Sequence, residues 1–369
     1  MRFIEEFRDP RLARNARSML LREAEGLPSA AFMEVCGTHT MSAFRCGLRG
    51  LLPPNVRLLS GPGCPVCVTP NDYLDLALAH SRRRDVVVAT FGDMMRVPGS
   101  RSSLEKERAL GADVRVVYSP LDALEIARKE PSRRVLFLGV GFETTAPLVA
   151  ASILEARESG VRNFAVLSGH KLVPPALEAL LAVKDLRLHG FLCPGHVSAV
   201  IGSDAYVPIA RDGRIPCVIA GFEPLDMIQG LLMLLRQVRA KSAEVQNQYA
   251  RVVTAGGNRK AREALARVFE PADAAWRGLG RIPSSGLRIR DEFREFDAEA
   301  VPPPESPEPS VEPRGCLCGL VLQGLKTPPE CPLFGKACRP ENPVGACMVS
   351  GEGTCAAYYK YGMDHYAHE

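Results

Sequence analysis

Eight short apolar runs between Ala30 and Gly221 place the strongest constraint on how this chain can fold. Each run is followed by a turn and by a segment in which apolar residues recur at helical spacing. Strands that are apolar throughout and alternate with helices are typical of parallel sheets covered on both faces. The pattern therefore predicts an α/β protein, with one sheet, a barrel or two smaller doubly wound domains. The runs are "AFMEV", "VRLLS", "DVVVATF", "DVRVVYS", "RRVLFLGV", "NFAVLSG", "LHGFLC" and "PCVIAGF".

A weak internal repeat favours two domains. The segments "LFLGVGFETTAPLVAA" (136–151) and "CVIAGFEPLDMIQGLL" (217–232) both read as a strand, then Gly-Phe-Glu, then a helix. The alternative is coincidence, because short strand–turn–helix units resemble one another. A chain of 369 residues also suits two or three domains, since a single core rarely extends beyond about 250–300 residues. We expect an N-terminal helix (1–28) packing on the body, two similar Rossmann-like domains (29–145 and 146–240), and a helical and cysteine-rich iron–sulfur domain (241–369).

The charge and the start of the chain argue against several functional classes. The net charge of +4 is small, and the basic residues are spread along the chain, so nothing indicates nucleic-acid binding. The first residues, "MRFIEEFRDPRLARN", lack the apolar core of a signal peptide, and no run reaches the ~18 apolar residues of a membrane span. We therefore expect a cytoplasmic protein. In a reducing cytoplasm, 12 cysteines favour metal ligation or thiol chemistry over structural disulfides.

Six cysteines lie in the last part of the chain, after a proline-rich and acidic segment (301–313) that reads as an extended linker. Their segment has too few large apolar residues for its own core, so we expect a bound metal to organise it. Zinc sites usually present two Cys-x(2–4)-Cys hooks, whereas an iron–sulfur cluster accepts wider spacings. The spacing favours a cluster, with zinc or unrelated thiols as alternatives. The predicted ligands are Cys316, Cys331, Cys338 and Cys355, and the predicted bystanders, either of which could replace a ligand, are Cys318 and Cys347.

Two further cysteine motifs lie nearer the N-terminus. Cys64 and Cys67, in "GPGCPVC", follow a predicted strand at an expected helix start, where the helix dipole stabilises thiolate and suits disulfide exchange. Cys36 and His39, in "MEVCGTHT", could bind a metal through thiolate and imidazole. The two motifs could instead be halves of one zinc site, and His39 alone could be a hydrogen-bonded residue at a strand end. Together with the tail, they indicate a redox or metal-assembly protein.

Other polar motifs also follow predicted strands. They are "GFET", "SGHK", "CPGH" and "GFEP", and they contain Glu143, His170, His196 and Glu223. Because chemistry in parallel sheets lies at the carboxyl ends of strands, these residues could orient a shared site or a partner. The alternative is that they cap the following helices. Neither a dinucleotide fingerprint nor a P-loop is present, since "GVGFETT" lacks the third glycine and the lysine.

Long motifs over nearly the whole chain resemble the hydrogenase maturation protein HypD family, in the family's order. They are "MEVCGTHT", "SGPGCPVCVTP", "TFGDMMRVPGS", "GVGFETTAP", "PGHVSAVIG", "GFEPLDM" and "CPLFGKAC…NPVGACMVSGEGTCAAYYKY". The resemblance implies two similar α/β domains with the site in the cleft between them, and a cluster domain. It also implies that the four predicted tail ligands, with fourteen, six and sixteen residues between them, bind a [4Fe-4S] cluster.

The resemblance further implies a function. Members of the family work with a small chaperone, HypC, as the scaffold on which the Fe(CN)2CO unit of [NiFe]-hydrogenase is built, and HypE provides the cyanide. By the match of motifs, Cys36 would bind the iron with His39 beside it. Cys64 and Cys67 would be a thiol/disulfide pair that receives electrons from the tail cluster. Soft thiolate suits low-spin iron with strong-field ligands.

We therefore expect a metal-cofactor assembly scaffold with thiol redox activity rather than a conventional turnover enzyme. The main alternative is an iron–sulfur-dependent protein disulfide reductase that uses Cys64 and Cys67. A structural zinc protein with a Rossmann-like body is a third possibility.

Overall fold

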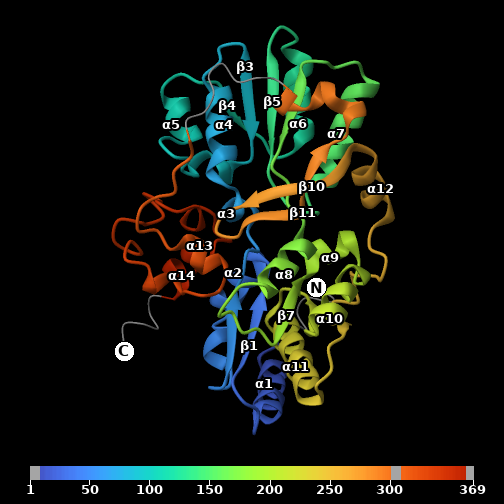
Figure 1. Ribbon diagram of the computed structural model, residues 1–369, viewed down its shortest axis with the longest axis vertical. Helices are drawn as coiled ribbons and strands as arrows, with labels where there is room; N and C mark the ends of the chain where they lie inside the picture. The colour runs from blue at the N-terminus through green and yellow to red at the C-terminus, as the bar shows by residue number, and fades with distance from the viewer. Residues whose placement is uncertain (1–8, 301–308, 363–369) are drawn as a thin grey trace.

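The computed structural model describes residues 9–300 and 309–362, and its body is built on two parallel sheets (Figure 1). Sheet A has the strand order β2-β1-β7-β8-β9, and sheet B has the order β4-β3-β5-β6. All eight predicted strands are confirmed, and the short β9 is an addition. The strands are β1 (Ala30–Glu34), β2 (Val56–Ser60), β3 (Val86–Thr90), β4 (Val114–Val116), β5 (Arg134–Gly139), β6 (Phe164–Ser168), β7 (Gly190–Pro194), β8 (Cys217–Ala220) and β9 (Val245–Asn247).

The two sheets are not consecutive along the chain. Strand β1 pairs with β2 on one side and with β7 on the other, in a register that places Phe32 beside Gly190. The whole of sheet B is formed between β2 and β7. The predicted break at residue 145 therefore does not separate the sheets, because each of the ranges 29–145 and 146–240 contains strands of both. Strand order depends on pairing between distant segments, which local sequence patterns do not reveal.

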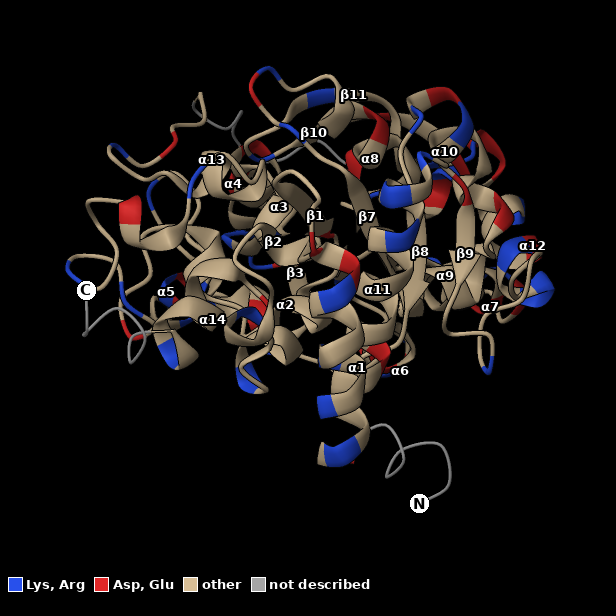
Figure 2. Cartoon of the chain, turned by 90° about the horizontal axis from the view of Figure 1, so that it is seen from below, with Lys and Arg blue, Asp and Glu red and all other residues tan. Residues whose placement is uncertain are grey.

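Helices cover both faces of the sheets, and charged residues lie mainly on the outer helices and loops (Figure 2). Strands β1 and β3 are buried along their whole length, as expected for central strands of covered parallel sheets. The helices are α1 (Pro10–Ala24), α2 (Gly37–Arg45), α3 (Pro65–Val68), α4 (Asn71–Ser81), α5 (Leu104–Ala109), α6 (Pro120–Lys129), α7 (Ala146–Glu158), α8 (Val173–Leu181), α9 (Gly195–Ile201), α10 (Val207–Gly213), α11 (Pro224–Ala240), α12 (Arg259–Val268), α13 (Cys318–Leu322) and α14 (Thr354–Tyr361).

The predicted N-terminal helix corresponds to α1, which packs beside α11. Its Leu20 is 1% exposed, and Glu23 accepts a hydrogen bond of 3.1 Å from Arg236 of α11. After Gly221 the chain forms the helices α11 and α12, with β9 between them.

An antiparallel hairpin, β10 (Phe269–Trp276) and β11 (Gly280–Ile289), lies between the two sheets and was not predicted (Figure 1). Its Trp276 is 2% exposed and donates to the hydroxyl of Ser285 at 2.8 Å. The strands of both sheets run toward the middle of the molecule, so the carboxyl edges of sheets A and B face each other across this region.

The cysteine-rich tail has short elements joined by turns and packs on the body. Besides α13 and α14 it contains the 3-10 turns η7 (Pro328–Glu330) and η8 (Ala346–Met348). Leu322 and Cys347 are fully buried in the same apolar core as residues of both sheets. Of the predicted linker, residues 301–308 lie outside the described residues. The remainder, 309–313, has no regular structure.

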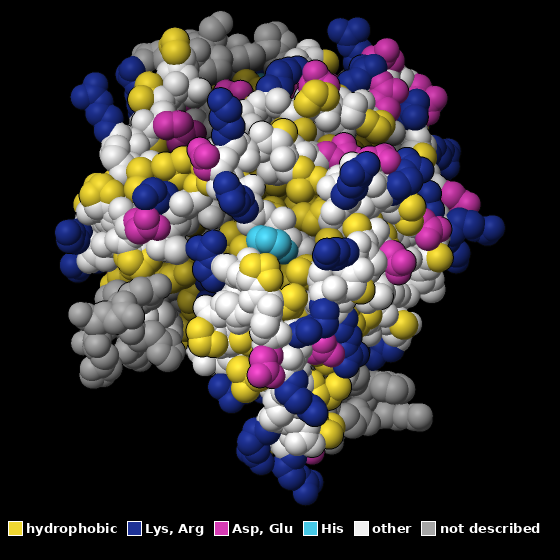
Figure 3. Space-filling view, turned by 60° about the horizontal axis from the view of Figure 1, so that its bottom comes forward, with side chains coloured by type: hydrophobic (Ala, Val, Ile, Leu, Met, Phe, Trp, Pro, Cys, Tyr) yellow, Lys and Arg dark blue, Asp and Glu magenta, His cyan; other side chains and the backbone are white. Residues whose placement is uncertain are grey.

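The remaining 3-10 turns lie in the body. They are η2 (Leu48–Leu51), η3 (Gly92–Arg96), η4 (Asp204–Tyr206), η5 (Asp291–Phe296) and η6 (Ala298–Ala300). On the face seen in Figure 3, exposed hydrophobic side chains are interspersed with Lys and Arg, and no large block of one charge stands out.

Candidate functional site

The two N-terminal cysteine motifs meet at the carboxyl edge of sheet A. Parallel pairing aligns the ends of β1 and β2, with Glu34 beside Ser60. The loop after β2 then crosses the end of β1 so closely that a Cβ on Gly63 would lie 2.2 Å from the backbone nitrogen of Cys36. Only glycine fits such an approach. The loop that carries Cys64 is therefore held directly against Cys36.

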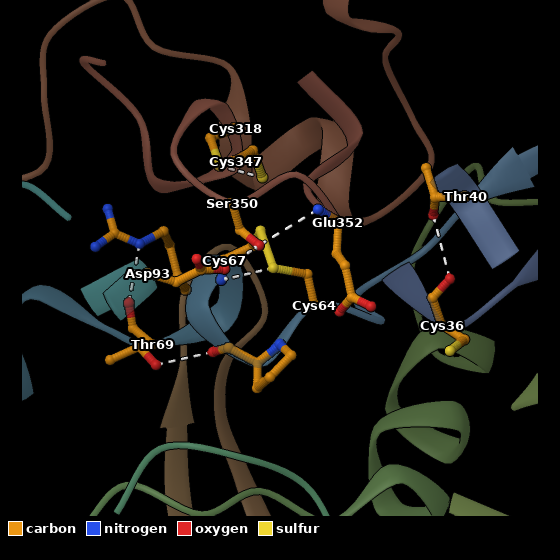
Figure 4. The surroundings of a disulfide bond; sticks show 12 residues. Cys36, Thr40, Cys64, Cys67, Thr69, Asp93, Cys318, Cys347, Ser350 and Glu352 are labelled. Carbon is orange, nitrogen blue, oxygen red and sulfur yellow. Dashed lines mark hydrogen bonds between the residues drawn. A yellow bond between two sulfur atoms is a disulfide. The ribbon is translucent and has the colours of Figure 1, made fainter. Parts of the chain in front are cut away.

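Cys64 and Cys67 form a disulfide (Figure 4), and they lie at the start of α3, which confirms the predicted helix start. Their Cα atoms are 5.2 Å apart. Cys64 occupies the N-cap, and its sulfur accepts from the backbone N–H of Cys67 at 3.3 Å. Both residues are buried, and Pro65 begins the helix. The pair can thus exist as a disulfide without rearrangement of the helix.

Cys36 is a buried free thiol at the N-cap of α2. Burial, and after it the carboxylate of Glu352, raises the pKa of this thiol to about 12, while the backbone N–H groups of His39 and Thr38 act in the opposite direction. The thiol is therefore protonated at neutral pH. A metal ion bound here would displace that proton, because thiolate is the ligand form.

Glu352, which was not predicted from the sequence, brings the C-terminal tail into this site. The hydroxyl of Thr38 donates to Glu352 at 2.6 Å, and a Cβ on Gly37 would lie 2.5 Å from the Cβ of Glu352. Ser350 accepts from the backbone N–H of Glu352 at 3.3 Å and donates to Asp93 at 2.8 Å (Figure 4). Hydrogen bonds thus join the tail to α2 and to the 3-10 turn that follows β3, which contains Asp93.

Glu34 is a second carboxylate of the site that was not selected. It is fully buried in β1 and accepts from the hydroxyl of Thr40 at 2.6 Å and from the backbone N–H of Cys36 at 3.4 Å. Burial raises its pKa to about 7, against the lowering effect of hydrogen bonds from Ser60 and Thr40 and of the charge of Arg49. This carboxyl group fixes the backbone on which Cys36 is placed.

His39 lies in the first turn of α2 and is completely buried. Its Nε2 is 2.9 Å from the carbonyl oxygen of Gly221, and its ring centroid is 4.6 Å from that of Phe222. His196 stacks on the same Phe222 ring at 4.0 Å. Burial lowers the pKa of His39 to about 4, so the imidazole is neutral at physiological pH. His39 and His196 therefore lie together at the carboxyl edge of sheet A, against the turn that follows β8.

The other selected polar residues have structural roles or lie elsewhere. Glu223 forms a capping box with Asp226 at the start of α11, which bears out the capping alternative. Glu143 is buried and accepts from the backbone N–H of Val173 at 2.9 Å, so it caps α8 rather than the helix that follows it in sequence. His170 is buried at the edge of sheet B, with its Nδ1 at 3.2 Å from the hydroxyl of Ser168.

The six tail cysteines form one connected group of thiols. The sulfurs of Cys318 and Cys347 are 2.9 Å apart, so the two predicted bystanders are in direct contact. Contact with Cys318 raises the pKa of Cys316, and contacts with Cys318 and Cys355 raise that of Cys347. Burial raises the pKa of Cys338, and the neighbouring Cys355 and Cys331 add to it. All four predicted ligands thus adjoin the same group.

The donors of this group are those of an iron–sulfur or a metal–thiolate site. Its donors are all thiols, which are the ligands that iron–sulfur clusters use, one for each iron of a [4Fe-4S] cluster. Among residues 9–300 and 309–362, no three His, Cys, Asp or Glu side chains converge on one position that could hold a single metal ion.

The tail thiols lie beside the Cys64–Cys67 pair. The turn η8, which contains Cys347, contacts α3, which contains Cys67. Both cysteines are completely buried in one apolar core. Figure 4 places Cys318 and Cys347 on one side of the disulfide and Cys36 on the other. The cysteines of this part of the molecule therefore follow one another from the tail to the end of β1.

The fold and the site define a class of α/β protein in which two facing parallel sheets enclose buried cysteines next to a cysteine-rich tail. The family model described as "HypD: Hydrogenase formation hypA family" matches residues 11–362. The hydrogenase maturation factor HypD of Azotobacter vinelandii is 50% identical over 100% of this chain and 98% of its own length. Those of Rhodobacter capsulatus and Escherichia coli K12 are 48% and 47% identical, over 98% of both chains in each case. The chain belongs to the HypD family of hydrogenase maturation factors. Within its described residues, none of the helices has the length and apolar character needed to cross a membrane.

Proposed function

We propose that this protein is a cytoplasmic scaffold on which the Fe(CN)2CO unit of [NiFe]-hydrogenase is assembled, together with a HypC-like small chaperone and a HypE-like cyanide donor. The iron unit is its cargo, and Cys36 is its ligand on this chain. The single observation that carries the proposal is the convergence of Cys36 with the Cys64–Cys67 disulfide at one sheet edge. Soft thiolate is the side chain that suits iron carrying strong-field ligands.

The Cys64–Cys67 pair would be the redox component of the site. It can exist as a disulfide at a helix N-terminus, where thiolates are also stabilised. The tail thiols Cys316, Cys331, Cys338 and Cys355 would hold a [4Fe-4S] cluster, whose chemistry is one-electron transfer. The contact of η8 with α3 supports electron delivery from the tail to the pair.

An iron–sulfur-dependent protein disulfide reductase is the alternative, since it would use the same pair and the same cluster. The burial of Cys36 beside the pair favours assembly. A reductase has no need of a third thiol that a glycine contact holds against its redox loop.

The test is infrared spectroscopy of the protein co-purified anaerobically with its small partner. The wild-type complex should show cyanide and carbonyl stretching bands, and Cys36→Ser should abolish them, because alkoxide is too hard and too basic to replace thiolate. Cys46→Ser is the matched control: this free thiol lies just after α2, is half-buried, and its sulfur donates to the carbonyl oxygen of Ala43 at 3.8 Å. Full bands in Cys36→Ser would overturn the proposal.

The cluster assignment has a separate test in the iron and sulfide content of single variants. Alanine at any of the four proposed ligands should remove most of both, whereas Cys318→Ala and Cys347→Ala should keep them. If either of these two loses its iron while one of the four ligands keeps it, the ligand assignment is wrong. Loss of the cluster should also destabilise the tail, because ligation contributes folding energy.

A further inference from the structure

The hydrogen bond of His39 determines which of its ring nitrogens is free. Its Nε2 is 2.9 Å from the carbonyl oxygen of Gly221. A carbonyl oxygen can only accept, so Nε2 carries the hydrogen, and Nδ1 of the neutral ring is an unprotonated acceptor. Nδ1 is buried and has no hydrogen-bond partner among the described residues. His39 therefore presents one unused lone pair inside the protein, three residues after Cys36, the N-cap of α2.

The position of the Gly221 carbonyl depends on Gln248, which follows β9. The backbone N–H of Gly221 donates to Oε1 of Gln248 at 3.1 Å. The Nε2 of Gln248 donates to Oδ1 of Asp226 at 2.8 Å and to Gln229 at 2.9 Å. These partners fix the orientation of the amide, because the backbone N–H needs an acceptor and the carboxylate needs a donor.

Asp226 anchors this arrangement. It is completely buried, and Arg251 binds both its carboxylate oxygens, at 2.8 and 2.6 Å. A Cβ on Gly221 would lie 2.3 Å from Oδ2 of Asp226, so the turn after β8 packs directly on the carboxylate. A bidentate pair of this kind gives geometric specificity in addition to energy. Gln248 joins this rigid pair to the turn that holds His39.

We propose that Gln248 is a positioning residue that, with Asp226 and Arg251, holds the Gly221 carbonyl so that His39 keeps its Nε2–H and its Nδ1 stays available as a hydrogen-bond acceptor for a group bound at this edge of sheet A. The group from which Nδ1 accepts carries an O–H, N–H or S–H donor. This inference rests on the proposed function in one respect: the proposed function says what binds at the site next to His39. The hydrogen-bond chain itself does not depend on it.

The first experiment measures how fast the Nε2 hydrogen of His39 exchanges with water, by NMR of protein labelled with nitrogen-15 in histidine. The signal is assigned by its absence from His39→Ala. Gln248→Met keeps the length of the side chain and removes its three hydrogen bonds, to Gly221, Asp226 and Gln229. We expect exchange to become at least about 10-fold faster, because the carbonyl is no longer held. Gln229→Met is the matched control, since it removes a neighbour of Gln248 but not the link to Gly221. Exchange in the control should not change.

The second experiment is a double-mutant cycle on hydrogenase maturation. If Gln248 acts through His39, the variant carrying both His39→Ala and Gln248→Met should be no worse than His39→Ala alone. A purely structural role would make the two losses multiply. Multiplied losses, or an unchanged exchange rate in a Gln248→Met protein of lower thermal stability, would overturn the inference.

A further variant covers the case in which Gln248→Met fails to fold. Gln248→Glu still accepts from Gly221 but opposes the carboxylate of Asp226, and it should accelerate exchange in the same direction. The exchange measurement needs neither a hydrogenase nor bound iron. A negative exchange result therefore speaks against the role of Gln248 alone, and a negative infrared result on Cys36 speaks against the proposed function.

Discussion

The Gly-Phe-Glu turn occurs twice in this molecule, at the ends of β5 and β8, and the two copies have different surroundings. In both sheets the preceding strand is second from an edge, and the next strand in sequence forms that edge. After β5, Phe142 stacks on Trp276 of the hairpin with ring centroids 6.0 Å apart, and Glu143 is buried. After β8, Phe222 lies against the rings of both His39 and His196.

The difference teaches that one local motif can serve packing or a site, depending on what is placed over it. The hairpin β10–β11 covers the first turn and makes its phenylalanine part of the core. The second turn packs against α2, so its glycine carbonyl and its phenylalanine position a histidine. The likeness between the copies is therefore one of strand order and turn, and only the second copy adjoins the candidate site.

The largest effects are expected when Phe142 and Phe222 are replaced in turn, because one is expected to serve packing and the other the candidate site. Phe142→Ala should lower the free energy of unfolding by about 3–5 kcal/mol, because it leaves a cavity beside Trp276, while the folded fraction still supports maturation. Phe222→Ala should cost less stability, since this side chain is only partly buried, and should lower maturation at least about 10-fold, as substitutions beside metal sites do. Urea unfolding and hydrogenase activity in a complemented strain measure both. The reverse pattern would contradict the comparison.

Glu143, in the Gly-Phe-Glu turn after β5, should make the free energy of unfolding depend on pH. Burial raises its pKa from 4.5 to about 7, so the native state holds a proton that the unfolded state has lost in this range. The free energy of unfolding should fall as the pH rises from about 4.5 to 7, by about 3 kcal/mol at 1.36 kcal/mol for each pKa unit. Glu143→Gln keeps the acceptor for Val173 and should flatten this part of the pH dependence. Equal slopes in urea titrations of the two proteins would contradict the assignment.

Glu223 should give the smallest effect. Its capping box with Asp226 predicts that Glu223→Ala lowers the free energy of unfolding by about 1 kcal/mol, as is typical for loss of an N-cap. Maturation should be retained, since Asp226 and Gln248 still hold the turn. Loss of maturation with unchanged melting temperature would show that Glu223 serves the site rather than the helix.

Local patterns in the sequence were sufficient to predict the strands and the cysteine motifs, because strand periodicity and Cys-x-x-Cys spacing are local properties. The hairpin was missed, since "FEPADAAW" has proline and alanine where strands usually have β-branched residues. Glu34, Glu352 and Gln248 were missed for another reason. Their roles arise from contacts with residues far away in sequence, such as that of Glu352 with Thr38, and burial of a carboxylate is not visible in one sequence.

The position of Glu34 shows where a signal existed. A glutamate inside the apolar run "AFMEV" is unusual for a central buried strand, and such a residue requires hydrogen-bond partners. Glu352 had a weaker signal, as an acidic residue between two glycines close to Cys355.

The insertion of sheet B between β2 and β7 has a consequence for how the protein folds during its synthesis on the ribosome. Strands β1 and β2 emerge first. One edge of β1 nevertheless stays unpaired until β7 is synthesised, after all the strands of sheet B. An unpaired strand edge is open to wrong partners, and domains formed later can fold as units in the meantime. The contact of Thr38 with Glu352 forms last, when nearly all of the chain has been synthesised. The hydrogen bond between the tail and the helix that begins after Cys36 is thus completed only when nearly the whole polypeptide has been made, and a prematurely terminated chain lacks it.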